Sequence, residues 1–185
     1  MNQLSLGAEI SIFLISSIIS LYVFAVLLRL LLGFSRADFR NPLSQFVVKA
    51  TNPVLAPMRR FIPSFGKIDT SAVVLAYGLT LLKNSLISLI GYGSMNLPQL
   101  LFTSLGDLII GIIWLYIIVL FIGVIFSWMG NAAHHPMYPL INSLTNPILR
   151  PIRKFVPSVG MMDFSTLVAI LLLNVLLIIA TRIFG

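Results

Sequence analysis

Four long apolar stretches constrain the fold of this chain more than any other feature of its sequence. They cover residues 10–34, 72–92, 108–128 and 164–183. Each is long enough to cross the roughly 30 Å hydrocarbon core of a bilayer, which takes about 20 helical residues. A span in lipid must satisfy its own backbone hydrogen bonds, and none of the stretches has the alternating polar face of a barrel strand. The sequence therefore predicts an all-α membrane protein with four transmembrane helices.

The composition supports the same class. Only 9% of the residues are charged and 58% are hydrophobic, so a water-soluble fold would have too few polar side chains to cover its surface. The first stretch lacks the basic start, the short apolar core and the A-x-A cleavage site of a signal peptide, and we interpret it as a retained span. The chain has no cysteine, which excludes disulfides, thiolate metal sites and cysteine nucleophiles.

A basic, proline-rich segment occurs twice, 94 positions apart. It reads TNPVLAPMRRFIPSFGKID at residues 51–69 and TNPILRPIRKFVPSVGMMD at residues 145–163. At this offset, 14 of the 33 residues in 42–74 are identical to their counterparts. The duplication predicts two tandem repeats, residues 1–94 and 95–185, each a two-span hairpin around one such segment. Because each repeat has an even number of spans, both should enter the membrane in the same orientation, as parallel repeats.

Each segment joining the two spans of a repeat begins with an amphipathic pattern. Its apolar residues fall at i, i+3, i+4 and i+7, which predicts a short interfacial helix; they are Leu43, Phe46, Val47 and Ala50 in the first copy, and Met137, Leu140, Ile141 and Leu144 in the second. Asn-Pro follows in both copies and suits an N-cap with proline at the first helical position. We therefore expect a second short helix to begin at Asn52 and at Asn146.

We call the segment that joins the two spans of a repeat its insert. Prolines, a glycine and an aspartate shape the rest of each insert. Proline lacks a backbone donor, so Pro57 should kink the second short helix, and Pro63 and its counterpart Pro157 should end it. A glycine turn is expected at residues 66 and 160. An aspartate at positions 69 and 163 should then cap the span that follows.

The distribution of Lys and Arg predicts the orientation. Basic residues cluster in residues 35–71 and 129–163, whereas residues 93–107 have none. By the positive-inside rule both basic segments should be cytoplasmic, and an even number of spans then places both termini in the periplasm. The net charge of +7 belongs to those segments. They lack an aromatic stacking surface or a recognised nucleic-acid motif, so no nucleic-acid partner is expected.

The doubled motif T-N-P-x-L-x-P-x-R-[RK]-F-x-P-S-x-G-x-x-D-x-S, with each copy following a span, resembles the two repeats of the YggT family (YlmG-like) of integral membrane proteins over essentially the whole chain. Two positions break the symmetry: Gly123 is the counterpart of Arg29, and Gly130 is the counterpart of Arg36. The resemblance implies a multi-pass protein of the bacterial inner membrane. It further implies a general link to osmotic or ion homeostasis, to cell or plastid division and, in photosynthetic branches, to cytochrome assembly, without an agreed biochemical activity.

Two candidate sites follow from the charged residues. The first is formed by the adjacent cations at the end of each insert, which we expect to dock anionic lipid or a protein partner; they are Arg59, Arg60, Arg153 and Lys154. The alternative is that these residues only mark topology and snorkel to the interface.

The second candidate site is a polar seam inside the membrane. Lys83 lies near the middle of the second stretch, where a charge is costly and should find partners between helices. The expected members of the seam are Tyr22, Thr80, Lys83, Asn84, Tyr116 and Asn174. The seam either lines an ion or solute path or pins the repeats together. No carboxylate is expected at that depth, since Asp107 and Glu9 are predicted nearer the outer face.

Enzymatic functions find little support in the sequence. The five acidic residues are dispersed, and adjacent His134 and His135 lack the further ligands of a metal site, so we predict no catalytic, cofactor or metal site. The favoured function is a non-enzymatic scaffold or assembly factor that supports envelope, osmotic or ion homeostasis, and the alternative is a small-ion transporter or channel component of the potassium type. Expected partners are membrane lipids, a membrane protein or further copies of the chain, with Gly7, Gly106 and Gly111 as candidate close-approach points.

Overall fold

The computed structural model describes residues 5–93, 95–128, 135, 137–156 and 163–184. Apart from one isolated β-bridge between Phe65 and Ile68, the regular elements of these residues are α-helices, and they are α1 (Leu6–Phe34), α2 (Pro42–Met58), α3 (Thr70–Tyr92), α4 (Leu97–Trp128), α5 (Tyr138–Ile152) and α6 (Phe164–Phe184). Four of them, α1, α3, α4 and α6, are long and apolar enough to cross a membrane. The predicted all-α protein with four membrane spans is confirmed.

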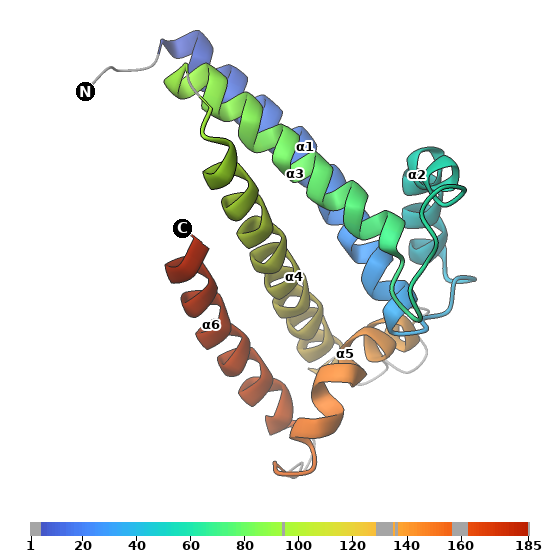
Figure 1. The fold of residues 1–185 in the computed structure, drawn as a ribbon. Helices are drawn as coiled ribbons and strands as arrows, with labels where there is room; N and C mark the ends of the chain where they lie inside the picture. The colour runs from blue at the N-terminus through green and yellow to red at the C-terminus, as the bar shows by residue number, and fades with distance from the viewer. Residues whose placement is uncertain (1–4, 94, 129–134, 136, 157–162, 185) are drawn as a thin grey trace.

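The spans form two hairpins that run the same way. Figure 1 shows α1 lying antiparallel to α3, and α4 antiparallel to α6, with α1 and α4 pointing in the same direction. The inserts α2 and α5 lie toward the same end of the four spans. Helix α4 packs against α6, α3 and α1 and so joins the hairpins, whereas α6 packs only against α4 and α5 among the described helices. The parallel arrangement of the repeats is thereby confirmed. The predicted boundary at residue 94 stays a prediction.

Helix α4 is longer than the sequence pattern predicted. It begins at Leu97 and not at residue 108, so residues predicted to lie in an outer loop are helical. Only residues 93–96 separate α3 from α4 along the chain. Gly93 ends α3 with φ +63°, in the left-handed region, and its N–H donates to the Leu89 carbonyl at 3.1 Å. Asp107, whose charge marks the edge of the apolar stretch in the sequence, lies inside α4.

The first insert is one helix and not two. Helix α2 runs from Pro42 through Pro53 to Met58, so Asn52 lies inside it and does not begin a second helix. The N-cap is Asn41, whose side-chain oxygen accepts the Leu43 N–H at 3.0 Å. Pro53 and Pro57 are both exposed and lie four residues apart, on one face of the helix. Each proline leaves one carbonyl of the helix without its intrahelical donor. Because the prolines lie on the exposed face, groups outside the helix can reach these carbonyls.

The buried face of α2 also differs from the predicted one. Val47 and Leu55 are buried together with Ser44 and Thr51, whereas Phe46 is 70% exposed. Helix α5 is likewise continuous through Pro147, and it buries Leu140, Ile141 and Leu144 as predicted. The predicted apolar stripe is therefore more deeply buried in the second insert than in the first.

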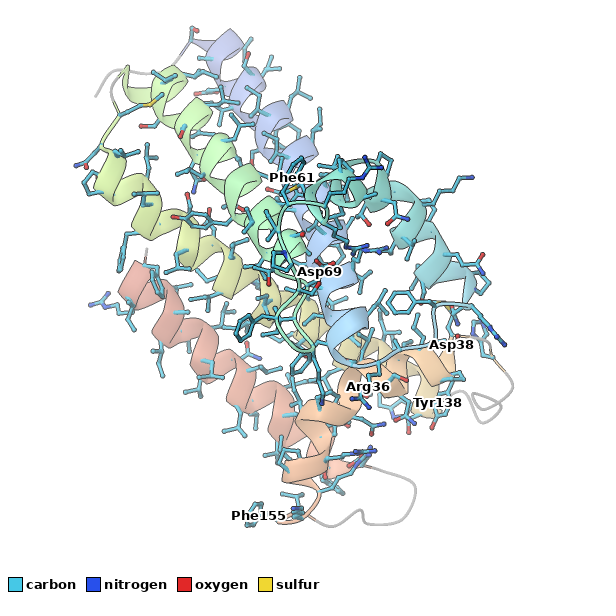
Figure 2. The ribbon with its side chains drawn as sticks, turned by 45° about the vertical axis from the view of Figure 1, so that its right-hand side comes forward. Arg36, Asp38, Phe61, Asp69, Tyr138 and Phe155 are labelled. Atoms are coloured by element: carbon cyan, nitrogen blue, oxygen red, sulfur yellow. The ribbon has the colours of Figure 1, made fainter. Side chains whose placement is uncertain are left out.

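The end of α1 explains one break in the symmetry of the repeats. Arg36 has φ +51°, a left-handed conformation that favours glycine, and its counterpart is Gly130, which lies outside the described residues. The Ala37 N–H then donates to the Leu32 carbonyl at 3.0 Å and satisfies one of the last carbonyls of the helix. Figure 2 shows Arg36 and Asp38 in the connection that leads from α1 into α2.

Two of the glycines proposed as contact points between copies are used inside the chain. A Cβ at Gly106 would overlap the Phe184 side chain, and one at Gly111 would lie 3.1 Å from Leu27 Cδ1. These positions allow α4 to approach α6 and α1 closely. A Cβ at Gly7 would have no neighbour within 4 Å, so this glycine is the open one of the three.

Candidate functional site

One Arg–Asp ion pair closes the insert of each repeat. Arg59 Nε and Nη2 both donate to Asp69 Oδ2, the Nε bond being 3.1 Å long. In the second repeat, Arg153 Nε and Nη2 donate to Asp163 Oδ2 at 3.0 and 2.6 Å. The same geometry therefore holds the end of α2 to the start of α3, and the end of α5 to the start of α6.

The serine two residues after each aspartate adds a second tie. Ser71 Oγ donates to the Ile62 carbonyl at 3.0 Å, and Ser165 Oγ donates to the Val156 carbonyl at 2.9 Å. Gly66 forms the intervening turn with φ +60°, as predicted, whereas Gly160, Pro157 and their neighbours lie outside the described residues. The D-x-S element of the motif thus locks the tip of the insert to the next span.

Both aspartates also cap the spans that follow them, as predicted. Asp69 Oδ1 accepts the Ala72 N–H at 3.4 Å, and Asp163 Oδ1 accepts the Ser165 N–H at 3.0 Å. Burial alone would raise the pKa of Asp163, but the hydrogen bonds from Arg153 and Ser165 and the charge of Arg153 outweigh burial and lower this pKa below its ordinary value. The carboxylate therefore stays ionised in the folded protein at neutral pH.

The ion pairs divide the predicted docking cations into two kinds. Arg59 and Arg153 are held by the aspartates, whereas Arg60 and Lys154 are exposed. The phenylalanine after each exposed cation is exposed as well, Phe61 by 86% and Phe155 by 85%. Figure 2 shows Phe155 projecting at the lower edge of the molecule. Each insert thus presents an exposed cation next to an exposed aromatic ring, and we call these two pairs the insert tips.

Lys83 has a partner, Asp107, that was predicted to lie nearer the outer face of the membrane. Lys83 Nζ lies 3.2 Å from Asp107 Oδ2, and the Asn84 amide donates to the same oxygen at 3.1 Å and to Ser104 Oγ at 3.0 Å. The prediction that no carboxylate lies at this depth is wrong. Lys83 lies about as far before the end of α3 as Asp107 lies after the start of α4, so antiparallel packing of α3 on α4 brings them together.

The other predicted seam residues do not all join this cluster. Thr80 lies one turn from Lys83 and donates to the Ala76 carbonyl, and Tyr116 is buried in α4. The Tyr22 hydroxyl instead contacts the Ala50 carbonyl of α2 at 3.5 Å. Asn174 donates to Ile170 of its own helix α6, which makes no packing contact with α3. The cluster therefore joins α3 to α4, and Asn174 takes no part in it.

Two cavities lie against these features. One of about 260 Å³ lies between α1, α3 and α4 and is lined in part by Thr80, Lys83 and Asp107. The other, of about 560 Å³, lies between α4, α5 and α6 and has Gly123 in its wall and the Arg153–Asp163 pair at its edge. The second cavity was not predicted from the sequence, although the exchange of Arg29 for Gly123 between the repeats was a signal for it.

The predicted pair of histidines is described only in part. His134 lies outside the described residues, while His135 Nδ1 accepts the Met137 N–H at 3.2 Å and its ring lies 5.0 Å from that of Phe126. Within the part of the chain that the structure describes, no three His, Cys, Asp or Glu side chains gather in a way that could hold a metal ion. The contacts of His135 are those of a residue that orders the start of α5.

Comparison with known proteins identifies several of similar sequence. A protein of Vibrio alginolyticus encoded in the proC 3' region is 44% identical over 158 residues, which are 84% of this chain and 85% of that protein. PA0392 of Pseudomonas aeruginosa is 40% identical over 168 residues, 90% of this chain and 85% of its own length. YggT of Escherichia coli K12 is 39% identical over 164 residues, 89% and 85% of the two chains. All three are described as uncharacterized.

No solved structure matches the chain. The sequence model of the CCB3/YggT family, however, matches it twice, at residues 8–90 and 102–184. Each match takes in one hairpin with its insert, so the internal repeat of the family coincides with that of the fold. The chain belongs to the CCB3/YggT family.

Proposed function

We propose that this protein is a non-enzymatic scaffold of the bacterial inner membrane, which uses its two insert tips to dock an acidic segment of a membrane protein partner at the cytoplasmic headgroup layer. The observation that carries the proposal is the repetition of one arrangement. In each repeat an Arg–Asp pair fixes the insert to the next span while the neighbouring cation and phenylalanine stay exposed. Exposed phenylalanine is costly in water, and a repeated cation–aromatic pair is suited to a partly apolar, acidic surface.

The position of the tips supports the same role. Both inserts lie toward the same end of the parallel hairpins, and we expect the tips to face a single leaflet. Each Lys or Arg near an anionic membrane surface contributes on the order of 1 kcal/mol, which orients the inserts but does not select a protein. Two tips on one rigid chain add selectivity, because a partner that engages both gains from the effective concentration of the second site.

Site-specific photo-crosslinking in cells tests the scaffold. A photoreactive residue replaces Phe61 or Phe155, and a third variant carries it at Phe13, a similarly exposed phenylalanine of α1. We expect both tips to give a protein adduct of the same mass and Phe13 to give lipid only. The combined Arg60→Gln and Lys154→Gln substitutions should abolish the adduct while leaving the Arg–Asp pairs in place. Lipid adducts alone from both tips would refute docking of a protein partner.

The physiological setting follows from the family resemblance. We place the scaffold in envelope, osmotic or ion homeostasis. A strain that lacks the gene should then grow poorly at a high or low osmolarity, and the wild-type chain should restore growth whereas the chain with Arg60→Gln and Lys154→Gln should not. Equal restoration by the two chains would separate the insert tips from this role.

A small-ion transporter is the second candidate, and one observation favours it. Lys83 and Asp107 form an ion pair within membrane-spanning helices and line a cavity of about 260 Å³. Ionisable groups at such positions often mark ion or proton routes. Purified protein in liposomes should then pass potassium above background, and Lys83→Met should change that flux. Background flux from wild-type protein that is folded by circular dichroism would leave the pair with a structural role.

A further inference from the structure

The cavity between α4, α5 and α6 has the size and position of a ligand site. Its volume of about 560 Å³ lies within the roughly 300–1,000 Å³ of small-molecule pockets. It is lined mainly by apolar side chains, and it extends from the Arg153–Asp163 pair along the facing sides of α4 and α6 as far as Leu120 and Leu171. We call this space the repeat-2 groove.

The groove exists where the repeats differ. Gly123 contributes no side chain to its wall, and among the described residues the only atom outside its own helix that lies within 4 Å of a Cβ built there is Ile141 Cγ2, at 3.5 Å. The counterpart in the first repeat is Arg29, whose long side chain interacts electrostatically with Arg59 and Asp69. Two of its guanidinium nitrogens, Nε and Nη1, are buried. A charged side chain thus reaches toward the ion pair in repeat 1, whereas repeat 2 leaves that space open.

The groove opens on the lipid-facing surface of the spans. Phe121, Leu167 and Leu171 line it and are 59%, 56% and 58% exposed in the isolated chain. These side chains belong to membrane-spanning helices, so their exposed surface meets hydrocarbon. An occupant can therefore enter sideways from the bilayer and needs an apolar body.

The charge where the groove reaches the insert determines which headgroup of an occupant is favoured. Arg153 lines the groove, and Arg150, three residues earlier in α5, is exposed. Asp163 neutralises one of these two cations, which leaves a net positive charge at the end of α5, where the groove reaches the insert. An anionic headgroup is favoured there by charge, and the Arg guanidinium suits phosphate oxygens.

We propose that the repeat-2 groove binds one anionic phospholipid from the leaflet that meets the inserts, with an acyl chain between α4 and α6 and the phosphate against Arg153. The volume argues against a helix of a partner or of a second copy. A helix with its side chains is about 10–12 Å wide, so the groove would hold little more than one turn of it. An acyl chain is thin enough to follow the groove along its length.

This site is separate from the insert tips. Its walls are Gly123 and the apolar faces of α4, α5 and α6, and its occupant needs neither Phe155 nor the tip of repeat 1. A chain that has lost crosslinking to a partner through Arg60→Gln and Lys154→Gln should therefore still retain the lipid. Loss of the groove should conversely leave the adduct from Phe61 intact.

Native mass spectrometry of the full chain tests the proposal, with phosphatidylglycerol or phosphatidylcholine added to the detergent-purified protein. We expect wild type to retain one phosphatidylglycerol, and phosphatidylcholine more weakly. Gly123→Leu fills the groove and should weaken phosphatidylglycerol binding about tenfold or more. Gly78→Leu is the matched control, because Gly78 is exposed on α3 with open space around it, and it should bind as wild type does.

A second pair of variants tests the headgroup contact and serves if Gly123→Leu does not fold. Arg153→Gln and Arg59→Gln each break the equivalent ion pair, but only Arg153 lines the groove. We expect Arg153→Gln to reduce the preference for phosphatidylglycerol over phosphatidylcholine, and Arg59→Gln to leave it unchanged. Equal retention of the two lipids by wild type, or equal effects of the two Arg substitutions, would overturn the proposal.

Discussion

At the scale of single residues, one carboxylate in each repeat performs two tasks. Asp163 uses Oδ2 for Arg153 and Oδ1 for the Ser165 N–H, so it joins the insert to α6 and caps that helix at once. Its pKa is lowered in the folded protein because these hydrogen bonds favour the ionised form more than burial opposes it. A group with a lowered folded pKa stabilises the fold at pH values above its unfolded pKa. That stability is lost as the pH falls through the folded pKa.

Two substitutions should separate the tasks of Asp163. Asn retains a side-chain oxygen for the cap but has no charge, so Asp163→Asn should cost at most about 1 kcal/mol of unfolding free energy for this partly exposed ion pair. Asp163→Ala also removes the cap and should cost about 0.5–2 kcal/mol more. Thermal unfolding in detergent at pH 7 measures both effects.

Thermal unfolding at acid pH tests the direction of the pKa shift of Asp163. Below about pH 4, near the pKa of Asp in an unfolded chain, wild type should lose stability faster than Asp163→Asn, because Asn has no proton to gain. Parallel loss of stability in the two proteins from pH 7 to pH 3 would contradict this account of Asp163.

The Lys83–Asp107 pair is expected to be coupled. The Lys83 side chain is 16% exposed, and its removal leaves the Asp107 carboxylate within the spans with only the Asn84 amide as described partner. Lys83→Met should therefore cost more stability alone than when it is combined with Asp107→Asn. A double-mutant cycle by thermal unfolding should give a coupling of about 0.5–3 kcal/mol. Additive costs would show that the two charges act independently.

At the scale of elements, the inserts show where local sequence signals gave way to packing. Asn-Pro is a good helix start in isolation, yet α2 continues through Pro53 because Val47, Thr51 and Leu55 are buried along one continuous face. Local signals predicted the structure correctly where no packing contact opposed them, as for Asp69 as a cap and Gly66 in a left-handed turn. Propensity decides an element's ends where tertiary contacts do not override it.

Two glycines, one inside α3 and one at its end, should respond to substitution by alanine with changes in stability of opposite sign. Gly93 has φ +63°, where an L side chain costs about 1–2 kcal/mol, so Gly93→Ala should destabilise the chain by that amount. Gly78 lies inside α3 with open space around it, so Gly78→Ala should be neutral or stabilise by up to about 1 kcal/mol. Thermal unfolding of both variants in one detergent measures the difference. Equal destabilisation by both would mean that the turn conformation does not matter.

At the scale of the whole molecule, the sequence predicted what depends on length and repetition. Four spans follow from four apolar stretches, and the parallel hairpins follow from an offset of 94 residues. It did not predict the contact between Lys83 and Asp107 or the repeat-2 groove. The first depends on how α3 and α4 are in register, and the second on the meeting of three helices around a glycine. Such features arise from packing between elements, and the exchange of Arg29 for Gly123 marks the place of the groove along the chain without giving its shape.

The orientation of the molecule gives the last prediction. The chain has no cysteine, so single-cysteine variants can be labelled with a membrane-impermeant maleimide without background. Arg60 and Lys154 are exposed in inserts at one end of the spans, while Met95 is exposed in the turn between α3 and α4 at the other end. Positive charge is retained on the cytoplasmic side, so Arg60→Cys and Lys154→Cys should react only in inside-out vesicles, and Met95→Cys only in intact spheroplasts. Reaction of the two insert positions from opposite sides would contradict the parallel hairpins themselves, since α1 and α4 could not then cross the membrane in the same direction.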